Sequence, residues 1–238
     1  MADRFPLRAL CLLLCLLGWP LSGAAATPQR IISLTPHLTE LLYDIGAGDR
    51  IVATDDASDF PPEVAPLPRV ANYRSINLEA LLAQKPDLVV AWRSAQSRML
   101  APVEKLGIPV FYSEPTDFAS LATEMRSLGR LLGTRQKADQ QADAYLARLD
   151  ALKQRYGKPK PVSVFYQLWY PPLTSVNDST WPGHAIRLCG GRNIMADASS
   201  PYPQVGLEQV IKANPTLILA GSRDPAVLAH WRQWSMLD

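Results

Sequence analysis

One stretch of sequence occurs twice in this chain, as LEALLAQKPDLVVA at residues 78–91 and as LEQVIKANPTLILA at residues 207–220. Each copy opens with an apolar-periodic run, continues to a Lys or Asn before proline, and closes on an unbroken apolar run. Proline ends a helix and favours extended geometry in the residue before it, and a continuous apolar run suits a strand that is covered on both faces. The stretch therefore predicts a short helix followed by a buried parallel strand.

The distance between the copies predicts two similar lobes. The second copy begins 129 residues after the first (207 against 78), and Tyr73 and Tyr202 keep the same offset just ahead of the copies. Solenoid repeats recur every 20 to 50 residues, so a unit repeated at this distance indicates duplicated lobes instead. We expect an N-terminal lobe over residues 27–116, a C-terminal lobe over residues 159–238, and a ligand cleft between them.

The segment between the lobes, residues 117–158, is expected to be helical, with a stop at Gly133 and a new start at Thr134. Residues 134–156 would form a helix of about 34 Å. Its apolar positions recur at spacings of three and four, which predicts one covered face; they are Ala142, Tyr145, Leu149, Leu152 and Tyr156. Strands alternate with helices elsewhere. The predicted class is thus α/β, with two Rossmann-like lobes of parallel sheet joined by a long rigid helix that limits opening.

The first 26 residues differ in character from the rest. Arg4 and Arg8 precede an apolar run, and three alanines precede Thr27, which is typical of a secretory signal peptide cleaved near Ala26. A lipid anchor at Cys15 is disfavoured because leucines flank that residue. Cleavage leaves Cys189, which is either buried and inert or without its partner. We expect the C-terminal lobe to be truncated at its end.

Composition excludes some classes of function. The chain has 238 residues, 47% of them hydrophobic and 19% charged, with a formal net charge of +2, so it lacks the basic excess that nucleic-acid binding needs. Its three histidines show no metal-ligand spacing. Ser33, His37 and Asp59 are the loose candidates for a catalytic triad. We expect no enzyme, no metal site and no cofactor.

Further motifs extend over nearly the whole mature chain: RIISLTPHLTE at 30–40, SDFPP at 58–62, KPDLVVAWR at 85–93, CGG at 189–191 and PQV at 203–205. The chain resembles the periplasmic vitamin B12-binding proteins of ABC importers, within the helical-backbone receptors for siderophores, haem and cobalamin. The resemblance implies a monomeric periplasmic protein that binds cobalamin and delivers it to an inner-membrane permease with its ATPase. The alternatives are a siderophore or haem receptor of the same fold, and an exported enzyme.

A cleft for a corrin, which is wide, flat and fringed with amides, needs aromatic faces and a few polar groups. Open parallel sheets bind ligands at the ends of their strands, and four candidates lie at or just after the end of a predicted strand; they are Trp92, Arg93, Trp169 and Tyr170. Tyr73 and Tyr202 are candidates because they lie in matching loops of the two lobes. The resemblance matches Trp92 directly and places Tyr73 and Tyr202 where a known relative has tryptophans. It also places Ala57 where that relative has a ligand-contacting tyrosine. The alternative is that these aromatic side chains belong to the core.

Glu79 and Glu208 occupy equivalent positions near the start of the two repeated helices. A glutamate there is stabilised by the helix dipole and the exposed amides, which is the simple explanation. Exposed charges on two related lobes can also guide docking on a two-fold transporter. The resembling family uses its glutamates in this way, so we expect a docking role for both.

Overall fold

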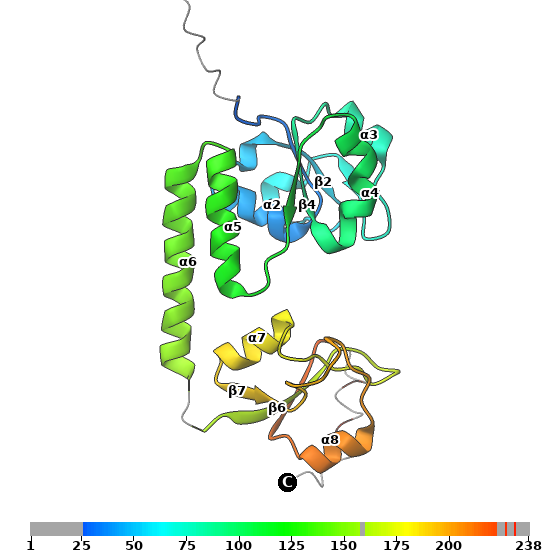
Figure 1. Ribbon diagram of the computed structural model, residues 1–238, viewed down its shortest axis with the longest axis vertical. Coiled ribbons are helices and arrows are strands. Elements are labelled where there is room, and N and C mark those ends of the chain that lie inside the picture. Colours follow the sequence, from blue (N-terminus) through cyan, green and yellow to red (C-terminus); the bar gives the residue numbers. More distant parts are fainter. Residues whose placement is uncertain (1–25, 158–159, 223–226, 228–230, 232–238) are drawn as a thin grey trace, which may run out of the picture.

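The computed structural model describes residues 26–157 and 160–222, together with residues 227 and 231. The predicted signal peptide and the expected truncation of the C-terminal lobe concern parts of the chain that lie almost wholly outside these residues. Within them, two parallel sheets are joined by a pair of helices, as Figure 1 shows. The predicted α/β class with two lobes is confirmed.

The first sheet has the strand order β3-β2-β1-β4-β5, and all its pairs are parallel. Its strands are β1 (Ile31–Ser33), β2 (Ile51–Asp55), β3 (Arg69–Ala71), β4 (Leu88–Trp92) and β5 (Val110–Ser113). The central pair, β1 and β4, is buried on both faces, as expected for apolar runs in a parallel sheet. Because the pairs are parallel, all the strands end at one edge of the sheet.

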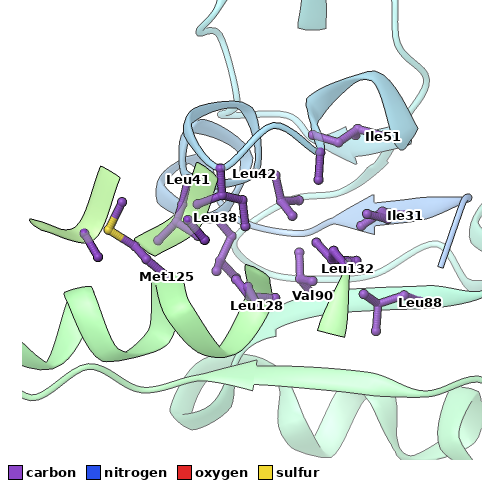
Figure 2. Close-up of a cluster of buried hydrophobic side chains, with 14 of the residues drawn as sticks. Ile31, Leu38, Leu41, Leu42, Ile51, Leu88, Val90, Met125, Leu128 and Leu132 are labelled. Carbon is purple, nitrogen blue, oxygen red and sulfur yellow. The ribbon is translucent and has the colours of Figure 1, made fainter. Parts of the chain in front are cut away.

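Helices cover both faces of the first sheet. One face packs against α2 (Pro36–Asp44) and α5 (Phe118–Leu131), through a cluster that includes Leu38, Met125 and Leu128 (Figure 2). The other face packs against α3 (Leu78–Ala83) and α4 (Arg93–Lys105). Two short 3-10 turns complete the lobe, η1 (Gly48–Arg50) and η2 (Pro62–Val64).

The joining helix is α6 (Arg135–Tyr156), which follows α5 after the predicted stop at Gly133, a residue with φ of 69°. The two helices approach closely at Gly129, where an added Cβ would lie 2.2 Å from Ala138 Cβ. Of the predicted stripe, Ala142 is buried and Tyr145 packs on the core, whereas Tyr156 is exposed. At 22 residues, α6 is about 33 Å long. It runs past α5 towards the second lobe (Figure 1).

The second sheet has the order β7-β6-β8, again parallel. Its elements are β6 (Val162–Gln167), α7 (Trp181–Leu188), β7 (Gly191–Asn193), α8 (Leu207–Ala213) and β8 (Leu217–Ala220). Val210 of α8 shares a core cluster with Phe165 of β6. Ile186 of α7 approaches Val164 and Gly191 on the opposite face.

The two lobes touch through α7 as well as through α6. His184 Nε2 lies 3.0 Å from the carbonyl oxygen of Thr116, and the rings of Phe118 and Trp181 are 5.2 Å apart. This contact lies at the start of α5, next to the joining helix (Figure 1). Side chains from both lobes therefore meet at the start of α5.

One detail of the repeated stretch was predicted wrongly. The residues before the prolines are left-handed, with φ of 48° at Lys85 and 40° at Asn214, because each reverses the chain at the end of its helix and donates its N–H to a carbonyl of the last turn. The strand of the first copy ends at Trp92, and α4 begins at once with Arg93. The helix and strand of each copy are otherwise as predicted.

Candidate functional site

The carboxyl ends of the first sheet's strands form one wall of the candidate site. Trp92 is the last residue of β4 and is 39% exposed, whereas the four residues before it are buried. Its backbone N–H donates to Gln96 Oε1 at 2.9 Å, and Gln96 Nε2 donates to the carbonyl of Leu34 at 2.9 Å. Because Gln96 is buried, these bonds tie the end of β4 to the end of β1. They fix the point from which the indole projects.

Two hollows share Trp92 and Pro36 in their linings. The first, which we name the α2–α5 cavity, has a volume of about 560 Å³. Its lining is mainly apolar and comprises Pro36, His37, Glu40, Leu41, Asp44, Trp92, Pro115, Leu121, Met125, Tyr145 and Trp181. Trp181 comes from α7, so the second lobe contributes to this cavity.

The second hollow, which we name the Tyr73 hollow, has a volume of about 610 Å³. It is bounded by the ends of β1, β2 and β4, and its lining includes Asp55, Ala57, Tyr73 and Trp92. Tyr73 is 85% exposed and is presented by a turn in which Asn72 Oδ1 accepts the N–H groups of Arg74 and Ser75. Tyr73 and Trp92, two of the predicted binding residues, are thus brought to one hollow.

In the second lobe, Trp169, Tyr170 and Tyr202 lie on neighbouring loops after β6 and before α8. Thr174 forms antiparallel bridges to both Trp169 and Gln204, which joins the two loops. Trp169 Nε1 donates to the carbonyl of Pro171 at 3.1 Å, and this bond orients the indole. All three aromatic side chains are at least half exposed, and they lie outside the linings of the two hollows.

The remaining predicted residues lie elsewhere. The guanidinium of Arg93 lies over the ring of Tyr112, 4.9 Å from its centroid, and Arg93 lines neither hollow. Glu79 and Glu208 are exposed in the first turns of α3 and α8, at equivalent positions. The core alternative is wrong for the five aromatic residues, because their exposed fractions range from 39% to 85%.

Sequence reasoning missed His37 and Trp181 as lining residues. His37 is the second residue of α2, and its ring meets that of Trp92 edge-on, with centroids 5.7 Å apart. Burial lowers the pKa of the His37 imidazole, and the nearby Asp55 carboxylate opposes that shift. Trp181 follows the Thr180 cap of α7 and precedes a proline, a start signal that could have located this helix.

The structure provides no support for a catalytic or metal site among its described residues. Ser33 Oγ is 2.8 Å from Thr39 Oγ1 and 3.4 Å from the Thr35 carbonyl, whereas His37 Nε2 lies 3.4 Å from Ser113 Oγ. The loose triad is therefore not assembled.

The described residues contain no cluster of three or more His, Cys, Asp or Glu suited to a metal ion. None of the helices in this part of the chain could span a membrane. Cys189 is exposed, so the buried alternative for it is wrong.

Comparison with known proteins places this geometry in a family. The model of the family described as periplasmic binding protein matches residues 31–235. This chain belongs to the periplasmic binding protein family. The resemblance found in its sequence motifs is thereby confirmed.

Curated members of the periplasmic binding protein family are similar to this chain over most of its length. A vitamin B12-binding protein of Vibrio campbellii is 37% identical over 229 residues, which cover 96% of this chain and 83% of the relative. One from Yersinia pseudotuberculosis is 37% identical over 230 residues, covering 95% and 81%. The similarity includes both lobes.

Solved structures of periplasmic binding proteins are also similar to this chain. The periplasmic vitamin B12-binding protein BtuF of Vibrio cholerae matches with a TM-score of 0.78 at 36% identity, covering 89% of this chain and 83% of that one. The haem-binding protein HutB of the same species matches with a TM-score of 0.75 at 24% identity, covering 83% and 77%. The second likeness is one of fold alone.

Proposed function

We propose that this chain is the substrate-binding component of an ABC importer, that it captures cobalamin between its lobes, and that it delivers cobalamin to an inner-membrane permease. The observation that carries the proposal is the pair of exposed aromatic groups at the strand ends of the two lobes. Tyr73 and Trp92 stand on one lobe, and Trp169, Tyr170 and Tyr202 on the other. The 37% identity of this chain to a protein named as vitamin B12-binding supports the same ligand.

The chemistry of these side chains suits a corrin. Large flat rings supply apolar contact area at low entropic cost, and the tyrosine hydroxyls and indole N–H groups can bond to the amides at the corrin edge. The charged side chains that line the α2–α5 cavity are the carboxylates Glu40 and Asp44, which favour a ligand without negative charge. Haem carries two carboxylates, so the same surroundings disfavour it.

The test is calorimetry of the mature chain, from Thr27 onwards, with cyanocobalamin, haemin and a ferric siderophore in separate titrations. We expect one-to-one binding of cyanocobalamin with a dissociation constant below about 1 μM, and much weaker binding of the other two. Preferential binding of haemin or the siderophore would assign the chain to the alternative receptor class. Recovery of chemically unchanged cobalamin after incubation, checked by mass spectrometry, separates binding from catalysis.

We also propose that Glu79 and Glu208 dock the loaded protein on the permease. Both are exposed, and both stand in the first turn of a helix of the repeated unit, so they can meet two related sites on a two-fold transporter. Glu79→Ala combined with Glu208→Ala should keep the affinity for cobalamin but weaken capture of the permease at least tenfold. The matched control is Glu63→Ala with Asp150→Ala, which removes the same charge from exposed positions elsewhere. Equal permease capture by both double variants would refute docking.

A further inference from the structure

His37 has surroundings that neither the fold nor the aromatic residues account for. It is partly buried at the start of α2, it lines the α2–α5 cavity, and its ring lies edge-on to that of Trp92 at an interplanar angle of 78°. A histidine at this place stands directly behind the indole that both hollows share. A ligand that contacts Trp92 in the α2–α5 cavity is therefore close to the imidazole.

A hydrogen-bond chain assigns the tautomer of this imidazole. Ser113 Oγ, at the end of β5, donates to Glu124 Oε2 at 2.6 Å. The serine hydroxyl has one proton, which this bond uses, so its oxygen accepts from His37 Nε2, 3.4 Å away. The proton of the neutral ring is then on Nε2, and the lone pair is on Nδ1. These hydrogen bonds leave Nδ1 as the one acceptor atom of the His37 ring.

Titratable groups lie on the elements near His37. Glu40 and Asp44 lie on the same helix at the cavity, Asp55 ends β2, Glu124 of α5 stands behind Ser113, and Tyr145 reaches the cavity from α6. The carboxylates favour a protonated imidazole, and Asp55 raises the pKa of His37. Burial is the larger effect, however, and lowers that pKa below its ordinary value of 6.5. The pKa of His37 therefore lies below 6.5, so the imidazole is neutral at pH 7.5 and becomes protonated only when the pH falls below that lowered pKa.

We infer that His37 is a ligand-contacting residue that selects for carboxamide side chains, by accepting an amide N–H of the ligand at Nδ1. The inference rests on the proposed function, since the corrin of cobalamin carries primary carboxamides around its edge. A neutral acceptor among carboxylates attracts an amide N–H donor and repels a ligand carboxylate. The cavity thus discriminates an amide-fringed macrocycle from one with anionic side chains, and Glu40 and Asp44 strengthen the discrimination.

The test is calorimetry with cyanocobalamin at pH 7.5 and pH 5.0, on the mature chain and on two variants. For the unaltered chain we expect the dissociation constant to rise as the pH is lowered from 7.5 to 5.0, because protonation removes the acceptor. His37→Leu should bind about five- to tenfold more weakly at pH 7.5, which is the usual effect of losing one hydrogen bond, and should lose the pH dependence. His37→Asn offers an amide oxygen that does not titrate. It should bind within about threefold of the unaltered chain at both pH values.

His184→Leu is the matched control, because His184 also bonds across elements but does not line the cavity. It should leave the pH dependence unchanged. The inference is overturned if His37→Asn keeps the pH dependence of the unaltered chain, or if His37→Leu binds as tightly as the unaltered chain at pH 7.5. A chain that binds no cobalamin at either pH would instead contradict the proposed function, so the two failures are distinguishable.

A second readout tests the selectivity. A monocarboxylic acid derivative of cyanocobalamin, in which one amide is hydrolysed at the edge that enters the cavity, should bind at least tenfold more weakly at pH 7.5. Glu40→Gln combined with Asp44→Asn should reduce that penalty, because it removes two carboxylates from the cavity lining. Equal binding of every monocarboxylic acid isomer and of cyanocobalamin itself would contradict the selective role.

Discussion

The two copies of the repeated stretch share a secondary structure but differ in burial. In the first copy, β4 lies inside a five-stranded sheet, and four of its five residues are buried. In the second, β8 pairs only with β6 among the described strands, and its leucines, Leu217 and Leu219, are 44% and 37% exposed. Local pattern therefore determines helix and strand, whereas burial depends on the neighbours that each lobe supplies.

The helix ends of the two copies show a similar difference. Asn77 caps α3, and its Oδ1 accepts the N–H of Ala80 at 3.0 Å, whereas Gly206 precedes α8 and offers no side chain. Both helices end on a left-handed residue at the same repeat position, Lys85 and Asn214. The geometry of the repeat has been kept although its residue types have changed.

The largest expected effect sharpens the comparison of burial. Leu88 and Leu217 occupy equivalent positions, 129 residues apart, with exposed fractions of 1% and 44%. Leu88→Ala should lower the free energy of unfolding by about 2–5 kcal/mol, because it leaves a cavity in a packed core. Leu217→Ala should cost less than about 1 kcal/mol. Urea denaturation of both variants measures the difference, and equal losses would mean that β8 is as enclosed as β4.

A smaller effect compares the two aromatic groups. Trp92 is anchored by Gln96 and shared by two hollows, whereas Trp169 stands on a loop outside both. Trp92→Ala should weaken cyanocobalamin binding about thirtyfold, or about 2 kcal/mol, as expected of a well-enclosed aromatic contact. Trp169→Ala should weaken it about three- to tenfold. Calorimetry with cyanocobalamin measures both affinities, and Tyr156→Ala serves as an exposed aromatic control on α6. The ranking is wrong if Trp169→Ala has the larger effect.

The smallest effect concerns the left-handed residues. Lysine has a Cβ that disfavours positive φ, glycine does not, and asparagine tolerates this region better than most residues. Lys85→Gly should therefore raise the free energy of unfolding by about 0.5–1 kcal/mol, and Asn214→Gly should change it by less. Paired denaturation curves test this. A loss of stability in Lys85→Gly would show that the side chain, not the backbone, dominates at that position.

Much of the fold could be predicted because its signals are local. Six elements could be located from sequence alone: α3, β4, α5, α6, α8 and β8. Their signals are the proline after each repeated helix, the glycine at 133 and the apolar runs. The strands β3 and β7 have three residues each, which is too short for a periodic pattern to emerge. The left-handed geometry at Lys85 was missed because lysine rarely adopts it and proline rules usually favour extended backbone.

The candidate site was predicted less completely. Trp92 was singled out at the end of a predicted strand and Tyr73 by its place in the repeat, and the structure brings both to one hollow. The guanidinium of Arg93 lies over the ring of Tyr112, and its binding role stays a prediction. His37 could not have been recognised from local sequence, because its tautomer depends on Ser113, which lies 76 positions further along the chain. Contacts of this range are set by the sheet and are not visible in a sequence window.

The most direct test of the central claim is a crystal structure of the mature chain grown with cyanocobalamin. We expect one corrin between the lobes, in contact with Trp92 on the first lobe and with Trp169 or Tyr202 on the second, and with an amide near His37 Nδ1. A corrin bound to one lobe alone, or seated away from Trp92, would contradict it.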